Sequence, residues 1–163
     1  MASPLLICAP NDVIIRFGGL QYVNQLMDSS ATGTYDPDRM TTIIKDGSSE
    51  VASFANVAVQ VDAWRRAIEA DPTLEWPHLL VDLSANQAVV LAWRYYSQGQ
   101  AMPAHTVSGG QFVMDMCEKI RLGQISIGAP PQYPTLQPPV KTITTSDPYQ
   151  DRMTLSAMLR YVG

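Results

Sequence analysis

One stretch limits the possible folds of this chain more than any other. Residues 77–97, PHLLVDLSANQAVVLAWRYYS, carry apolar side chains on every side of a helix. Proline suits the first turn of a helix, and a Leu- and Ala-rich run favours helical backbone. A helix that is apolar all round has to be covered on all sides. We therefore expect a mainly α protein, a small helical bundle around a buried central helix over residues 77–97.

A second long helix is predicted from the capping signals at YDPDRM. Asp36 is a suitable N-cap, and Pro37 then occupies the first helical position. Apolar residues recur at helical spacing from there to about Asn56. Gly47 lies inside this helix, where it costs about 1 kcal/mol relative to alanine. We interpret it as the mark of a close crossing with another helix.

Shorter elements are predicted on either side of these two helices. Asn11 is expected to cap a helix over 12–17 that Gly18-Gly19 stops, and a second helix follows over 20–27. Residues 2–9 are interpreted as an extended segment and a candidate edge strand. Residues 57–76 are ambiguous, because VAVQV alternates like a strand whereas DAWRRAIEA favours a helix, placed at 61–70.

The last predicted helix has Pro103 as its candidate start and ends at Gly123 in the C′ position. The pair Gly109-Gly110 is interpreted as a turn signal, like Gly18-Gly19. A short extended exit follows over 125–128. The apolar face of this helix is predicted to consist of Phe112, Val113, Met116, Cys117 and Ile120.

The C-terminal residues 129–163 hold half of the twelve prolines and lack an evident core of their own. Ordering a segment of this length costs roughly 35–70 kcal/mol, at about 1–2 kcal/mol per residue. Burying its apolar side chains returns roughly 12–24 kcal/mol. We therefore divide the chain into a helical domain, 1–128, and a proline-rich link with a docking arm, 129–163. The residues predicted to bind partners are Val140, Ile143, Tyr149, Met153, Leu155, Leu159 and Tyr161, with strand addition through 140–145 as one mode.

Composition narrows the classes of function. Charged residues make up 16 % of the chain and the net charge is −4, whereas about 25 % is typical of soluble domains. This acidic balance argues against tight nucleic-acid binding, which needs clustered basic side chains.

Cys8 and Cys117 follow no metal-binding spacing and are expected to be reduced and buried. The longest apolar run, residues 88–93, is far too short to span a membrane. The first residues lack the basic side chains of a signal peptide. We therefore expect a soluble, cytosolic protein without membrane contact.

Residues able to carry catalysis are sparse. His78 and His105 are the only histidines, and neither has a second ligand at metal-binding spacing. A triad can be drawn through Ser84, His78 and Asp82, but no nucleophile-turn motif supports it. The acids of YDPDRM are better explained as helix caps than as a metal site. We therefore expect that the protein is not an enzyme and that it binds neither a metal nor a cofactor.

Two short runs combine arginine with aromatic residues. They are Trp64-Arg65-Arg66 and Trp93-Arg94-Tyr95-Tyr96. Such runs can contact a phosphate backbone, or the arginine stems can lie on aromatic rings at a contact between subunits. We favour the subunit contact.

The order of these features resembles the Mu-like phage and prophage head-completion proteins, which are head–tail connectors or adaptors. The resemblance lies in NDVIIRFGG, IIKDGSSEVASF, PHLLVDLSANQAVVLAWRYY, MDMCEKIRLGQISIG and the closing DRMTLSAMLRYVG, in that order. It covers about residues 11–128 and the last dozen residues. The chain departs from the pattern by a longer stretch at 57–76 and by the proline-rich link at 129–140.

The resemblance implies a virion protein of the neck, assembled in the host cytoplasm. Its domain 1–128 would be an adaptor that forms a homo-oligomeric ring of about twelve copies beneath the portal. The ring would extend the DNA channel, without sequence-specific DNA binding, and would offer a platform to the next tail or stopper protein. The alternatives are a small DNA-binding protein related to packaging and, as a third class, a hydrolase.

Overall fold

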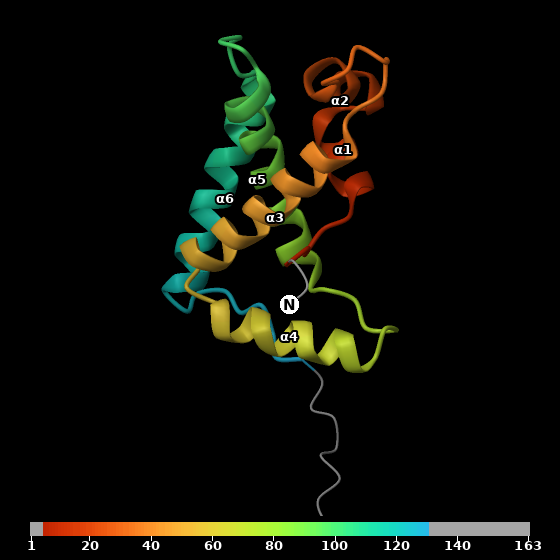
Figure 1. Ribbon diagram of the computed structural model, residues 1–163. Helices are drawn as coiled ribbons and strands as arrows, with labels where there is room; N and C mark the ends of the chain where they lie inside the picture. Colours follow the sequence, from red (N-terminus) through yellow and green to blue (C-terminus); the bar gives the residue numbers. More distant parts are fainter. Residues whose placement is uncertain (1–4, 131–163) are drawn as a thin grey trace, which may run out of the picture. The chain divides into compact units, whose positions relative to one another are not determined.

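The computed structural model describes residues 5–130, and residues 1–4 and 131–163 lie outside the described part. The described residues form six α-helices and no strand (Figure 1). The expectation of a mainly α fold is confirmed. The helices are α1 (Pro10–Phe17), α2 (Leu20–Met27), α3 (Pro37–Phe54), α4 (Ala58–Ala70), α5 (His78–Tyr96) and α6 (Ala104–Arg121).

Helix α5 is the buried centre of this body, as its apolar sequence predicted. Ten of its residues are buried, and α1, α2, α3 and α6 all pack against it. In Figure 1, α6 runs alongside α5 while α3 crosses it obliquely. An added Cβ at Gly47 of α3 would lie 2.9 Å from the backbone nitrogen of Ala88 and 3.2 Å from the carbonyl oxygen of Ser84. Glycine is therefore what allows the two helix backbones to meet, as predicted.

The buried apolar side chains form two groups, one toward each end of α5. The first joins α1 and α2 to the first half of α3 and the second half of α5, with Val13, Val23, Met27 and Ile43 fully buried. The second lies around the second half of α3, the start of α5, and α4 and α6. Its members include Ile7, Val51, Val61, Leu80, Leu83, Val113, Cys117 and Ile127.

The segment before α1 packs against the helices instead of forming an edge strand. Ile7 is only 2 % exposed, and its backbone N–H donates to the hydroxyl of buried Ser48 in α3, at 3.1 Å. The prediction of Asn11 as N-cap is wrong by two residues, because Ala9 caps α1 and Pro10 takes the first helical position. The carboxylate of Asp12 then accepts from the Ala9 N–H at 2.7 Å. That bond is the N3 half of a capping box, and Ala9 offers no side-chain acceptor to the N–H groups of the first turn.

The ambiguous stretch after residue 56 is helical from Ala58, three residues before the predicted start. Val57 and Val61 are buried, whereas Val59 is 78 % exposed. Positions 57 and 61 are four apart, which puts them on one face of a helix as well as on one face of a strand. The alternating pattern therefore could not distinguish the two structures. Helix α4 ends near residue 70 as expected.

Two further predictions, both about residues of helix α6, are wrong. The pair Gly109-Gly110 is not a turn but lies inside the helix, where an added Cβ at Gly110 would be 3.2 Å from Val90 of α5. Phe112 is 42 % exposed and so does not belong to the buried face. Gly123 has φ +71° and ends the helix with N–H bonds from residues 123 and 124 back to Ile120 and Lys119, as predicted.

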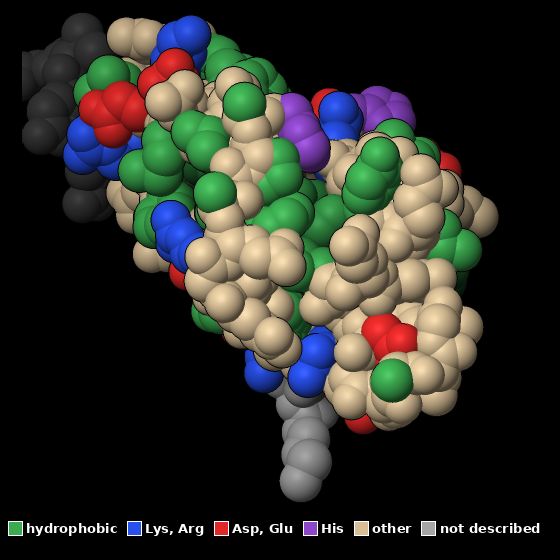
Figure 2. Space-filling model, turned by 90° about the horizontal axis from the view of Figure 1, so that it is seen from above, with side chains coloured by type: hydrophobic (Ala, Val, Ile, Leu, Met, Phe, Trp, Pro, Cys, Tyr) green, Lys and Arg blue, Asp and Glu red, His purple; other side chains and the backbone are tan. Residues whose placement is uncertain are grey.

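The surface of the body is poor in charge. Figure 2 shows one face on which hydrophobic and uncharged atoms cover more area than charged side chains. Within residues 5–130, no helix has both the length and the apolar character that crossing a bilayer requires.

Candidate functional site: an apolar groove between α5 and α6

A groove of about 460 Å³ with mainly apolar walls lies between α5 and α6 and is closed at one side by the end of α3. We call it the α5–α6 groove. Its apolar wall residues are Phe54 of α3, Val90 of α5, Met102 before α6, and Val107 and Met114 of α6. Its polar lining residues are Gln87, Arg94, Thr106, Gln111 and Asp115.

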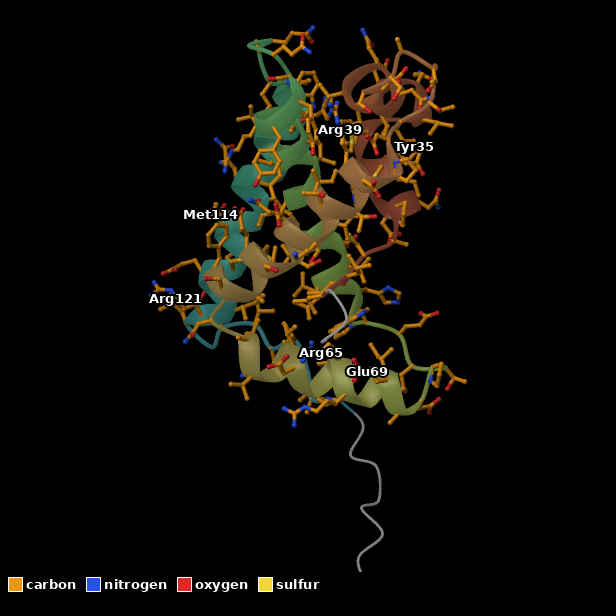
Figure 3. All side chains as sticks on the ribbon, in the orientation of Figure 1. Tyr35, Arg39, Arg65, Glu69, Met114 and Arg121 are labelled. Atoms are coloured by element: carbon orange, nitrogen blue, oxygen red, sulfur yellow. The ribbon has the colours of Figure 1, made fainter. Side chains whose placement is uncertain are left out.

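The groove exists because α6 approaches α5 closely at one point and presents side chains beside it. Gly110 has no side chain to fill the space next to Val90. Val107 and Met114, each about one turn from Gly110 and on either side of it, then form the wall instead. Figure 3 shows Met114 on the outer side of α6, far from the loop that carries Tyr35.

The apolar walls are open to solvent. Phe54 is 37 % exposed, Val107 is 44 % exposed and Met114 is 54 % exposed. Exposed apolar residues are common singly, but a group that lines one hollow is typical of a surface that binds an apolar partner. This group includes residues from two helices that are distant in sequence.

Three polar groups give the groove its chemistry. Gln87 is 3 % exposed, and its amide donates to the carboxylate of Glu50, which fixes the side chain at the groove floor. Thr106 is also 3 % exposed, and its hydroxyl has no hydrogen-bond partner among the described residues. Arg94 is exposed and, within residues 5–130, forms no ion pair. The groove therefore combines apolar walls with one cation and an unsatisfied hydroxyl.

Helix α6 is apolar on two opposite flanks. Met114 lies on the groove flank, whereas Phe112, about 200° away around the helix, lies on the other. Sequence reasoning missed Phe54, Val107 and Met114 as binding candidates. The available signal was the spacing of Val107 and Met114, which places them together on a face that excludes the buried Val113 and Cys117.

The seven arm residues predicted to bind partners lie outside the described residues, so their role stays a prediction. They are Val140, Ile143, Tyr149, Met153, Leu155, Leu159 and Tyr161. The division of the chain at 128/129 likewise stays a prediction. The exit segment before it packs on the body, because the indole N–H of Trp64 donates to the Gly128 carbonyl at 3.3 Å.

The side chains of the possible triad, Ser84, His78 and Asp82, do not form a catalytic arrangement. Asp82 forms an ion pair with Arg16 of α1, and His78 is exposed at the start of α5. The Ser84 hydroxyl is fully buried and has no hydrogen-bond partner in the part of the chain that the structure describes. No hydrogen bond links these three side chains. His105 is exposed at the start of α6. Among the described residues, no cluster of three or more metal-ligating side chains occurs.

The capping interpretation of Asp36 is confirmed. Its carboxylate accepts from the N–H of Asp38 at 2.9 Å and from that of Arg39 at 3.5 Å. The Ser29 hydroxyl also donates to it, and this bond, with the N–H bonds, lowers the pKa of Asp36 below its usual range. The nearby Asp28 carboxylate accepts hydrogen bonds from three backbone N–H groups of the loop before α3, those of Ser30, Thr32 and Gly33. These bonds, with that of Gly33 the most important, lower the pKa of Asp28.

The two arginine–aromatic runs are largely engaged within the body. Arg65 pairs with Asp62 at 3.0 Å, and Arg66 donates to the backbone of Asp62. In the second run, the guanidinium carbon of Arg39 in α3 lies over the ring of Tyr96, 4.6 Å from the ring centroid. Of these runs, Arg94 is the member that lines the groove.

Both cysteines are free and buried, as predicted. Burial, with a smaller contribution from Asp12, raises the pKa of the Cys8 thiol to about 12. Burial raises the pKa of the Cys117 thiol to about 11. Neither thiol is therefore ionised near neutral pH, and neither is an activated nucleophile.

Comparison with known proteins gives no match: no protein-family model fits the chain, and no curated protein or solved structure is significantly similar to it.

Proposed function

We propose that this chain is a structural subunit, a head-to-tail connector of a tailed phage that assembles as a ring beneath the portal and extends the DNA channel. The observation that carries the proposal is the presence of exposed large apolar side chains on different sides of one small helical body. They include Ile15, Leu20 and Tyr22 on α1 and α2, and Phe54, Val107, Phe112 and Met114 on α3 and α6.

A ring needs this kind of surface. In a closed ring of identical subunits, each copy contacts its two neighbours through two different surfaces. Phe112 and Met114 lie on opposite flanks of α6, so one helix can contribute to both. A body with a single apolar patch would favour a two-fold dimer instead.

The charge of the body suits a channel through which DNA passes. Residues 1–130 carry thirteen acidic and eight basic residues, which leaves a net charge of −5. Four of the eight basic side chains in residues 5–130 form ion pairs with carboxylates, namely Arg16, Arg39, Arg65 and Arg121. An acidic surface with few free cations binds phosphate weakly, which disfavours the alternative of a DNA-binding packaging protein.

Deletion of the gene from the phage or prophage that carries it tests the proposal. We expect lysates with DNA-filled heads and free tails that fail to join, because the connecting ring is absent. Expression of the full chain from a plasmid should restore joined particles. Normal particles after deletion, or empty heads that indicate a packaging defect, would contradict the connector role.

A further inference from the structure

The α5–α6 groove is built to hold an apolar segment, and the described residues leave it unfilled. Its walls are Phe54, Val90, Val107 and Met114, three of them more than a third exposed. Thr106 adds a buried hydroxyl that has no hydrogen-bond partner within residues 5–130. Peptide recognition by such grooves uses apolar anchors at helical spacing, at positions i, i+3, i+4 and i+7.

The chain itself contains a segment with that spacing. In residues 152–162, RMTLSAMLRYV, the side chains at Leu155, Met158, Leu159 and Val162 stand at i, i+3, i+4 and i+7. We propose that residues 152–162 of one copy bind in the α5–α6 groove of a second copy. This inference rests on the proposed function, because it names the contact that links neighbouring subunits in the ring.

Charge supports this occupant. The body carries −5, whereas residues 131–163 carry three basic and two acidic residues and so a net charge of +1. The segment has Arg152 and Arg160 beside its apolar anchors. The groove offers Asp115, a carboxylate that forms no ion pair within residues 5–130.

The length of chain between body and anchors allows contact with a neighbour. About 25 residues separate Pro130 from Leu155, which can reach up to roughly 80 Å when extended. Five of these residues are prolines, at 131, 134, 138, 139 and 148. Proline-rich linkers favour extended backbone and so hold their two ends apart, which favours another copy over the segment's own body.

Strand addition, the mode expected for residues 140–145, is not available on this body. The described residues 5–130 contain no strand and thus no sheet edge. Strand addition would need a partner of another fold. Between copies of this chain, a helix in a groove is the mode that the described surface can accept.

Disulfide trapping with full-length chains tests the inference. One chain carries Met114→Cys and the other, fused to a tag that changes its size, carries Leu159→Cys. The control chain carries Val59→Cys, which is matched in chemistry and lies on α4. Val59 is 78 % exposed and Met114 is 54 % exposed, so random collision favours the control. The native cysteines are buried and remain in place in all chains.

We expect the Met114→Cys and Leu159→Cys pair to form mixed disulfides at least about tenfold faster than the control pair at millimolar protein, because docking raises the local thiol concentration. Excess wild-type chain should suppress the cross-link. Excess chain with Leu155→Asp and Leu159→Asp should not, because its anchors are lost.

Two outcomes overturn the inference: mixed disulfides that form no faster than those of the control pair, or suppression of the cross-link by both competitors alike. These outcomes are separate from failure of the proposed function. If gene deletion leaves heads and tails unjoined while the cross-link fails, the connector role stands and the groove contact is wrong. If the cross-link forms but deletion has no effect on joining, the copies associate through the groove for another purpose.

Discussion

The crossing of α3 and α5 at Gly47 gives the sharpest test of the fold. Replacing Gly47 with alanine adds a Cβ that would lie 2.9 Å from the Ala88 nitrogen and 3.2 Å from its Cα. Both are backbone atoms, which cannot rotate away as a side chain can, so the two helices must separate. Alanine gains about 1 kcal/mol in helix propensity, whereas forcing extra volume into a packed core typically costs about 1–3 kcal/mol.

The helix separation also affects its neighbours, because Ser48 beside Gly47 is fully buried and holds the N-terminal segment. We therefore expect Gly47→Ala to lower the free energy of unfolding by up to about 2 kcal/mol, which is the packing cost less the gain in helix propensity. The assay is urea unfolding followed by circular dichroism at the helical band, with the midpoint compared at constant slope.

Gly109→Ala is the matched control for this prediction. It is the same substitution within a helix, but the nearest atom to the added Cβ is the Asn86 side-chain oxygen at 3.0 Å, which can rotate away. Gly109→Ala should therefore be close to neutral or stabilising by up to about 1 kcal/mol. If Gly47→Ala is as stable as the control variant, the close crossing is wrong.

Three further predictions follow from the described contacts. Ser48→Ala should lower the free energy of unfolding by about 1–3 kcal/mol in urea titration, since it leaves the Ile7 N–H buried without an acceptor; an unchanged midpoint would exclude the anchoring role. Asp36→Ala should lower the thermal midpoint at neutral pH but not in strong acid, because a carboxylate with a lowered folded pKa contributes fully above its unfolded pKa and loses this contribution as the pH falls through the folded pKa. A difference in midpoint that persists in acid would contradict this prediction. The thiol pKa values of Cys8 and Cys117 are raised to about 12 and about 11. Both thiols should therefore react with iodoacetamide at pH 8 far more slowly in the folded chain than in urea, as counted by intact mass. Equal rates would contradict their burial.

The long helices could be predicted because their sequences determine their structure locally. Asp36 and Pro37 fix the start of α3, and the all-round apolar character of residues 77–97 requires a covered central helix. Gly47 could be interpreted as a crossing because a mid-helix glycine is costly unless space requires it.

The errors arise where one pattern fits two structures. Residues 57–61 satisfy both helical and strand spacing, so α4 was predicted to begin too late. Gly109-Gly110 has the composition of a turn, and its place inside α6 depends on the approach of Val90, which lies far away in sequence. Spacing could show that Val107 and Met114 share a face of α6, but the groove itself could not be predicted, because its walls come from α3, α5 and α6 and depend on how these helices pack.

The central claim is that this chain works as a repeated subunit at the junction of head and tail. The most direct measurement is cryo-electron microscopy of the neck in particles produced by the phage or prophage that carries the gene. The account predicts a ring below the portal in which each repeat fits the six-helix body of residues 5–130. A neck built without this body, in particles otherwise complete, would contradict the account.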